Sequence, residues 1–312
     1  MAGEHPLDPA TRDEPAGDPP RAPSRPDAHS RPRRLQNLLI AIALLAEFVA
    51  LIGHPLFGWG PTRATYAATP APLTLSPPLP PSGAAVLIRL AAVAAQRSGL
   101  VGAPHGTYAY VKRETWQLAP QRSGHAPPSV VVPVIIESWR DLGGGTGRVV
   151  TLARDPRIKT GTPRVSAPSG AALPALATTA VALVRRLQAA APAGAGPATG
   201  FLGLAGLTAD QPVPPEAQAA ILRLLARAPG VINSGTVTDR AGRPGVAVSV
   251  DSAGSGQLVR TTLVFAAATG ALLEADQTLV GDPQRSDVQQ GAVLAYTTFL
   301  AAGDVGSVTA RP

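Results

Sequence analysis

The chain of 312 residues contains no cysteine. It can therefore form no disulfide, offer no thiolate to a metal ion and use no cysteine as a nucleophile. Lysine is nearly absent as well, since Lys112 and Lys159 are the only two. The bias towards alanine, glycine, proline and arginine that accompanies this scarcity is typical of a genome rich in G and C, and it says nothing about chemistry.

Histidine is scarce too, and its few copies are poorly placed for catalysis. His105 and His125 are flanked by proline and glycine, so we expect both in solvated loops. The other three lie in the N-terminal tail or beside a long apolar run: His5, His29 and His54. The sequence has no HExxH motif, no paired histidine spacing and no GxSxG elbow. It therefore predicts no metal site and no cofactor, although spacing alone does not exclude a Ser-His-Asp triad.

The chain is basic, with 27 Lys and Arg against 20 Asp and Glu and a pI near 10.7. Arginines and acids balance within residues 1–34, so the surplus belongs to the rest of the chain, where it is spread thinly. A nucleic-acid-binding surface would need a basic stripe, which the sequence lacks. We therefore expect no nucleic-acid partner, and only weak attraction to anionic lipid headgroups or wall polymers.

A nearly unbroken apolar run, LLIAIALLAEFVALIG, occupies residues 38–53. As a helix it spans about 24 Å, so residues 35–57 are needed to cross a hydrocarbon core of about 30 Å. On insertion scales the acidic Glu47 raises the free energy of membrane insertion by about 2.5–3.5 kcal/mol, whereas its large apolar neighbours lower it by about 3–7 kcal/mol. Residues 35–57 are thus predicted to form a single transmembrane helix. Glu47 is either a functional group or one that tilts or pairs this helix.

Arginine placement predicts the orientation of the helix. Five arginines lie between residues 21 and 34, whereas only Arg63 follows closely behind the run. The positive-inside rule then leaves the N-terminus in the cytoplasm and sends the C-terminal part outside. A cleaved signal peptide is the alternative, with a cleavage site at Thr65-Tyr66-Ala67, but its charged region would be unusually long. The predicted location is the cell membrane, with a single-pass signal anchor.

Composition divides the remainder of the chain. Residues 1–34 are rich in proline, aspartate and arginine, and we expect a disordered cytoplasmic tail. Residues 58–82 form a proline-rich linker, in which TPAPLTLSPPLPP at 69–81 predicts a polyproline spacer about 40 Å long. Residues 83–312 are expected to fold as one extracytoplasmic domain.

Hydrophobic periodicity predicts helices and strands in that domain. Helical spacing recurs at 83–97, 176–187 and 217–228, and an Ala/Gly/Pro spacer at 189–200 separates the last two. Strands are predicted at 108–118, 129–140, 148–153, 231–238, 245–250, 257–265, 271–280 and 293–300, with a polar loop at 155–169. Short glycine turns favour antiparallel pairing. The predicted class is α+β, with a curved antiparallel sheet and about three helices.

Aromatic residues on the first two predicted strands are the candidate binding residues: Tyr108, Tyr110, Trp116 and Trp139. Together they could line an apolar ligand cavity in the curved sheet, with ordinary core packing as the alternative. No catalytic residue is assigned.

Acidic residues on the strands are the remaining chemical groups: Glu114, Glu137, Asp141, Glu274 and Asp276. The last two share a face of one predicted strand. We expect solvated strand faces for all five, and a paired acid and base is the alternative interpretation.

Four stretches resemble a family of uncharacterised actinobacterial single-pass membrane proteins. They are 85–110 leading into GTYAYVKRETW, ESWRDLGG at 137–144, PPEAQAAILRLLARAPGVINSGTVTDRAGRPG at 214–245 and FAAATGALLEADQTLV at 265–280. The resemblance implies a helix and a curved sheet similar to the half-barrels of lipoprotein carriers and sigma-regulator sensor domains. Residues 1–34 show neither an amphipathic helix nor a His/Cys zinc motif, which argues against direct binding of a sigma factor.

These observations favour a membrane-anchored extracytoplasmic domain that senses or binds a ligand, such as a lipid or another apolar molecule, without catalysis. Two alternatives stay open: a cell-envelope hydrolase, and a structural envelope protein that binds a partner protein.

Overall fold

The computed structural model describes residues 67–76, 81–97, 106–118, 131–144, 147–153, 164–166, 176, 179–253, 257–282 and 288–312. All of them belong to the second of the two compact units into which the chain divides, Met1–Pro61 and Thr62–Pro312. The predicted tail, residues 1–34, and the predicted transmembrane helix, residues 35–57, lie outside the described residues. None of the described helices is long and apolar enough to cross a membrane.

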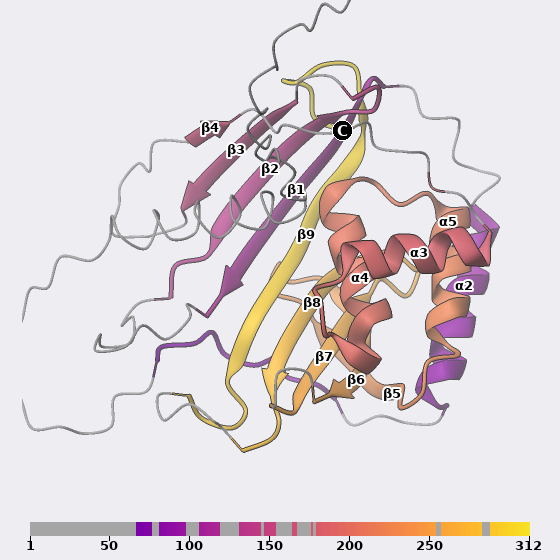
Figure 1. Ribbon diagram of the computed structural model, residues 1–312, viewed down its shortest axis with the longest axis vertical. Coiled ribbons are helices and arrows are strands. Elements are labelled where there is room, and N and C mark those ends of the chain that lie inside the picture. The colour runs from indigo at the N-terminus through magenta and orange to yellow at the C-terminus, as the bar shows by residue number, and fades with distance from the viewer. Residues whose placement is uncertain are drawn as a thin grey trace, which may run out of the picture. The chain divides into compact units, whose positions relative to one another are not determined.

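Within the described residues, nine strands form one antiparallel sheet in the order β4-β3-β2-β1-β9-β8-β7-β6-β5 (Figure 1). The first four are β1 (Tyr108–Gln117), β2 (Val134–Asp141), β3 (Arg148–Ala153) and β4 (Arg164–Ser166). The others are β5 (Ile232–Thr238), β6 (Pro244–Ser252), β7 (Val259–Phe265), β8 (Leu272–Leu279) and β9 (Val293–Val305). The last strand, β9, lies between β1 and β8 and joins the two halves of the sheet.

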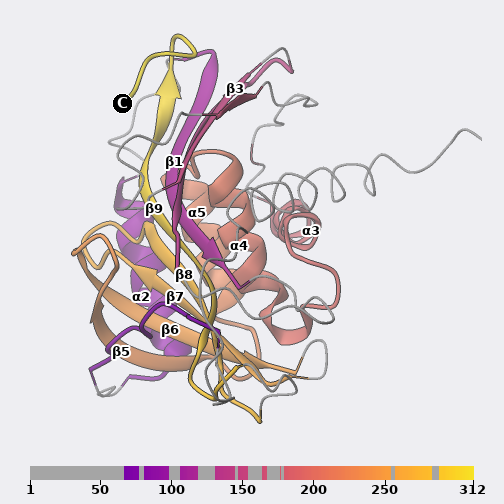
Figure 2. The same cartoon turned by 90° about the vertical axis from the view of Figure 1, so that its left-hand side faces the viewer.

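The sheet is curved (Figure 2). Register shifts interrupt four of the strand pairings, at Lys112/Arg113 in β1, Asn233/Gly235 in β5, Val264/Phe265 in β7 and Gln277/Thr278 in β8. A bulge adds a residue to one strand of a pair and bends it. The predicted curved antiparallel sheet of an α+β protein is confirmed.

Four described α-helices lie on the side of one sheet face (Figure 2): α2 (Gly83–Arg97), α3 (Ala180–Ala190), α4 (Thr199–Asp210) and α5 (Pro215–Leu225). A short 3-10 turn, Gly196–Ala198, precedes α4. We call the sheet face that they cover the helix face and the opposite one the outer face.

The main core lies between the helices and the helix face of the sheet. Leu87 of α2, Phe201 of α4 and Ile221 of α5 are fully buried there. From the sheet, Leu263 and Phe299 join the same cluster. Burying each such side chain contributes about 1.5–3 kcal/mol, so this interface supplies most of the apolar burial that positions the sheet.

The structure has four described α-helices where the sequence predicts about three, because the pattern predicts no helix at 199–210, where α4 lies. Glycines made the segment TGFLGLAGLTAD a weak helix candidate. In the structure they allow close packing of α4 on α3. A Cβ atom on Gly203 would lie 2.2 Å from the carbonyl oxygen of Leu187, and one on Gly206 would lie 2.5 Å from that of Ala190. The glycines are therefore packing residues rather than loop residues.

The predicted strands are found, several with shifted ends. The helix at 83–97 and the strand at 148–153 have the predicted bounds. The predicted polar loop at 155–169 is wrong in part, because it contains β4, which pairs with β3. The last strand continues beyond residue 300 to Val305, since its end pairs with the start of β1 across a bulge.

An extended segment, residues 67–76, lies on the outer face, and we call it the strap. Its half-buried Leu73 and Leu75 pack on an outer-face cluster that contains Val237 and Val264. At its end, the backbone N–H of Ser76 donates to the carbonyl oxygen of Thr236, 2.9 Å away. This part of the predicted proline-rich linker is thus packed against the domain.

Candidate functional site

Three of the four predicted binding aromatics come together. Tyr110 on β1 is paired with Trp139 on β2, and their ring centroids are 5.0 Å apart. Both are fully buried, and the half-buried Tyr108 packs against the same cluster. The chain's own C-terminal residues cover the pair, because the indole N–H of Trp139 donates to the carbonyl oxygen of Ala310 at 2.6 Å. These aromatics are packed side chains in the structure.

Trp116 lies elsewhere. It shares the outer face with Tyr110, because the two residues are six positions apart on a regularly alternating strand. It packs, however, in a second cluster with Leu279, Val293 and Tyr296. It is 8% exposed. The structure therefore places the four predicted residues in two clusters, and none of them lines either of the two cavities described below.

Two rows of side chains cross the outer face between these clusters. Strand register places Glu114 opposite Thr298, and Thr298 opposite Glu274. The next row runs from Trp116 through Tyr296 to Asp276. The prediction that Glu274 and Asp276 share a face is confirmed.

The expectation that these carboxylates are solvated is wrong for three of them. Glu274 is 0% exposed, Asp276 2% and Glu114 8%. Arg240 lies over this surface, where it pairs with Glu274 and Asp276 and stacks on Tyr296. Glu137 is also mostly covered, at 13% side-chain exposure, and forms ion pairs with Lys112 and Arg311. Asp141 accepts a hydrogen bond from the backbone N–H of Gly143 in the following turn.

Arg240 is the centre of the buried network. Its guanidinium forms an ion pair with Glu274 and lies 2.9 Å from Oδ2 of Asp276. Its backbone N–H also donates to Glu274 Oε2 at 2.9 Å. On its other side, Nη2 donates to the carbonyl oxygen of Ala71 in the strap at 3.0 Å. One side chain thus ties the strap to β8.

Burial changes the acidity of these groups. It raises the pKa of Glu274 and of Asp276, and the positive charge of Arg240 opposes the rise in both. Burial, followed by the nearby charge of Glu114, raises the pKa of Tyr296. Its hydroxyl therefore remains a donor, and it bonds Oε1 of Glu114 at 3.0 Å. The hydroxyls of Thr298 and Thr278 donate to Glu274 and Asp276 respectively.

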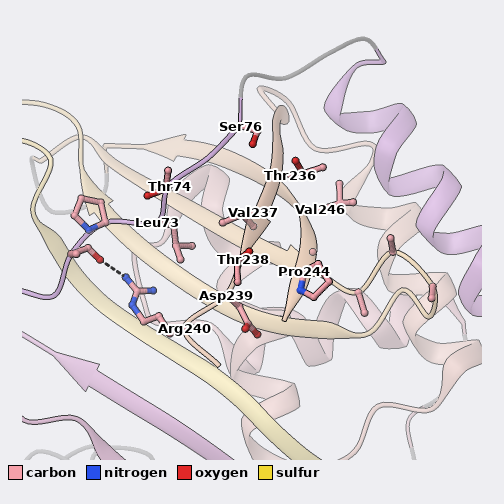
Figure 3. A pocket seen from close by; sticks show the side chains of 16 residues that line it. Leu73, Thr74, Ser76, Thr236, Val237, Thr238, Asp239, Arg240, Pro244 and Val246 are labelled. Atoms are coloured by element: carbon pink, nitrogen blue, oxygen red, sulfur yellow. Dashed lines mark hydrogen bonds between the residues drawn. The ribbon is translucent and has the colours of Figure 1, made fainter. Parts of the chain in front are cut away.

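Beside this network lies a groove of about 930 Å³ between the strap and the β5–β6 hairpin (Figure 3). Its walls come from four segments: residues 71–74 and 76 of the strap, 236–240 of β5 and its turn, 244–246 of β6 and 266–268 after β7. Methyl groups and hydroxyls dominate the lining, from side chains such as Leu73, Val237, Thr74 and Thr238.

The two charged residues of the groove are already paired. Arg240 is held by Glu274 and Asp276. Asp239 accepts hydrogen bonds from the backbone N–H groups of Ala241 and Arg243, and it forms an ion pair with the Arg243 side chain. The groove therefore offers a ligand mainly apolar surface and neutral hydroxyls.

The sequence analysis missed this groove. One available signal was the Leu-Thr-Leu alternation at 73–75, which places two large apolar side chains inside a proline-rich linker. Another was the D-x-x-G-R turn at 239–243, whose Asp239 and Arg243 form the ion pair described above. Neither signal reveals that the strap and the hairpin meet.

No family model, curated protein or solved structure matches the chain.

Proposed function

We propose that residues 83–312, together with the strap, form a non-enzymatic ligand-binding domain. The domain binds an uncharged, mainly apolar molecule, such as a lipid, in the groove beside the strap. The transmembrane helix at residues 35–57 anchors it to the cell membrane, with the N-terminus in the cytoplasm and the domain outside. The observation that carries the proposal is the groove of about 930 Å³ whose charged groups are neutralised by the protein itself.

The groove is open to solvent, and its volume is that of a site for a small apolar ligand. Ligand pockets commonly enclose about 300–1,000 Å³, with apolar walls and a few polar groups that orient the ligand. Here Thr74, Thr236 and Thr238 are the threonines of the lining. A charged ligand would lose its hydration without gaining a free counter-ion, so it is disfavoured.

The same pairing supports binding over hydrolysis. A general acid or base needs a titratable group within reach of its substrate. The carboxylates of Glu274 and Asp276 are instead occupied by Arg240 and by threonine hydroxyls. His105 and His125, the histidines available for a Ser-His-Asp triad, lie outside the described residues.

Native mass spectrometry of the full-length protein tests this function. Protein purified from its own membranes and released from a nanodisc should carry an uncharged apolar molecule of defined mass. Denaturation should release that molecule for identification. A protein that never retains such a molecule, even after incubation with a total lipid extract, would contradict the proposal.

A further inference from the structure

A second cavity, of about 180 Å³, lies away from the groove and has a different lining. Three glutamines contribute to it: Gln117 from β1, Gln257 from the segment before β7 and Gln277 from β8. The remaining lining residues are apolar: Leu118, Val288, Leu294 and Ala295. Among the described residues, no charged side chain lines this cavity.

Strand register brings two of the glutamines onto one face. Gln117 pairs with Ala295, and Ala295 pairs with Gln277. The two long side chains therefore flank a small one, which leaves room between them. Gln117 is exposed and the other two glutamines are half-buried, so all three amides are accessible to solvent or to a ligand, and none has a hydrogen-bond partner among the described residues.

A neighbouring hydroxyl is also unsatisfied. Thr261 stands opposite Gln277 in the next strand, is 1% exposed, and its Oγ1 has no hydrogen-bond partner. A buried polar group without a hydrogen-bond partner lowers the stability of the folded state by about 1–3 kcal/mol, and such groups are rare in native proteins. Thr261 is not among the described residues that line the cavity, but it lies beside Gln277, which is.

The chemistry of the lining defines a class of ligand. Each glutamine offers two N–H donors and a carbonyl acceptor, so the three amides suit a molecule that both donates and accepts hydrogen bonds. The described lining has no charged side chain to pair with an ionic ligand, and Leu118 and Val288 provide an apolar wall. At about 30 Å³ per water, the cavity holds about six waters, which is the size of one sugar ring.

We propose that this cavity is a binding site for a neutral, hydroxyl-rich ligand of the size of one sugar ring. Gln117, Gln257 and Gln277 bind the hydroxyls of that ligand, and the apolar wall packs against the face of its ring. The site is separate from the groove beside the strap, so it does not depend on the function proposed above.

Saturation-transfer NMR tests the site, with N-acetylglucosamine as the probe. The full-length protein is used in nanodiscs free of glycolipid and of sugar-based detergent. The double variant Gln117→Leu and Gln277→Leu removes two amides with little change of shape, and it should weaken binding at least about tenfold. Gln188→Leu, at an exposed position of α3, is the matched control and should bind as the wild type does.

Several outcomes would overturn the proposal. The first is that the wild-type protein transfers no saturation to the sugar, and the second is that the double variant transfers as much as the wild type. The third is that glucose 6-phosphate binds more tightly than the neutral sugar. If circular dichroism shows that the double variant is unfolded, the single variant Gln257→Leu replaces it. That residue lies outside the strands, and its loss should also weaken binding.

Discussion

The guanidinium carbon of Arg240 lies 4.2 Å from the ring centroid of Tyr296. This stacking holds a cation over β9 while its nitrogen atoms reach Glu274 and Asp276 on β8 and Ala71 in the strap. A cation over an aromatic ring contributes about 0.5–2 kcal/mol, depending on its desolvation. The larger effect is structural, because the contact fixes the strap where it forms one wall of the groove.

Replacement of Arg240 should destabilise the domain strongly. In Arg240→Met, Glu274 and Asp276 stay buried without their cation, and removing one partner of a buried ion pair costs about 3–5 kcal/mol. Urea unfolding followed by circular dichroism measures this loss. Arg223→Met, at an exposed position of α5, is the control and should change the free energy of unfolding by less than about 0.5 kcal/mol.

The buried carboxylates should give an unusual pH dependence. Burial raises the folded-state pKa of Glu274 above its ordinary value of 4.5 and that of Asp276 above 3.8. At a pH between the ordinary and the raised pKa of each group, the folded state therefore binds more protons than the unfolded state. The contribution of these groups to stability therefore falls as pH rises through that window.

Asp276→Asn removes one of the two titrating groups and should flatten this part of the pH profile, measured as the free energy of unfolding between pH 4 and 8. Asp282→Asn, at an exposed position after β8, is the matched control. A profile that is equally steep in wild type and Asp276→Asn would show that Asp276 is not the source of the dependence.

Of the four predicted binding aromatics, Trp139 should cause the largest loss of folding stability when it is replaced. Trp139→Ala removes a fully buried ring and should cost about 3–5 kcal/mol. Trp139→Phe keeps a ring but loses the N–H that bonds Ala310, which should cost about 1–3 kcal/mol. Tyr108→Phe, in the half-buried neighbour, serves as the control. Chemical denaturation of the three variants measures how much each lowers the free energy of unfolding. A small loss in Trp139→Ala would show that the aromatic cluster is loosely packed.

Topology can be tested on the intact chain. Five arginines before residues 35–57 and one shortly after predict that a reporter enzyme fused after Pro312 is active outside the cytoplasm. The protein should also remain in the membrane fraction after alkaline washing. Release of most of the protein into the medium would instead indicate cleavage near Ala67.

The sequence predicted the elements whose signal is local. The helix at 83–97 and the strand at 148–153 have the expected bounds because each carries its apolar pattern within its own residues. The helix at 199–210 was missed because its glycines suit contact with the backbone of α3, an effect of tertiary packing that local propensity does not contain.

The candidate site depended still more on distant contacts. Alternation could place Glu274 and Asp276 on one face. Their ion pairs, however, come from Arg240, which lies 34 residues before Glu274 and itself bonds Ala71 of the strap, 169 residues earlier in the chain. The pairing of Tyr110 with Trp139 follows from the predicted strands, whereas their cover comes from residues near 310. Composition alone assigned the strap to a free linker.

Binding of Nile red, an uncharged apolar dye, to two variants of the β5–β6 hairpin tests the central claim most directly. Thr238→Trp places a bulky ring at an exposed lining position, whereas Ala241→Trp adds the same ring to the hairpin turn outside the lining. The account predicts that the wild type and Ala241→Trp bind the dye alike, and that Thr238→Trp binds it at least about tenfold more weakly while remaining folded. Equal affinity of a folded Thr238→Trp and the wild type would contradict the assignment of the groove as the binding site.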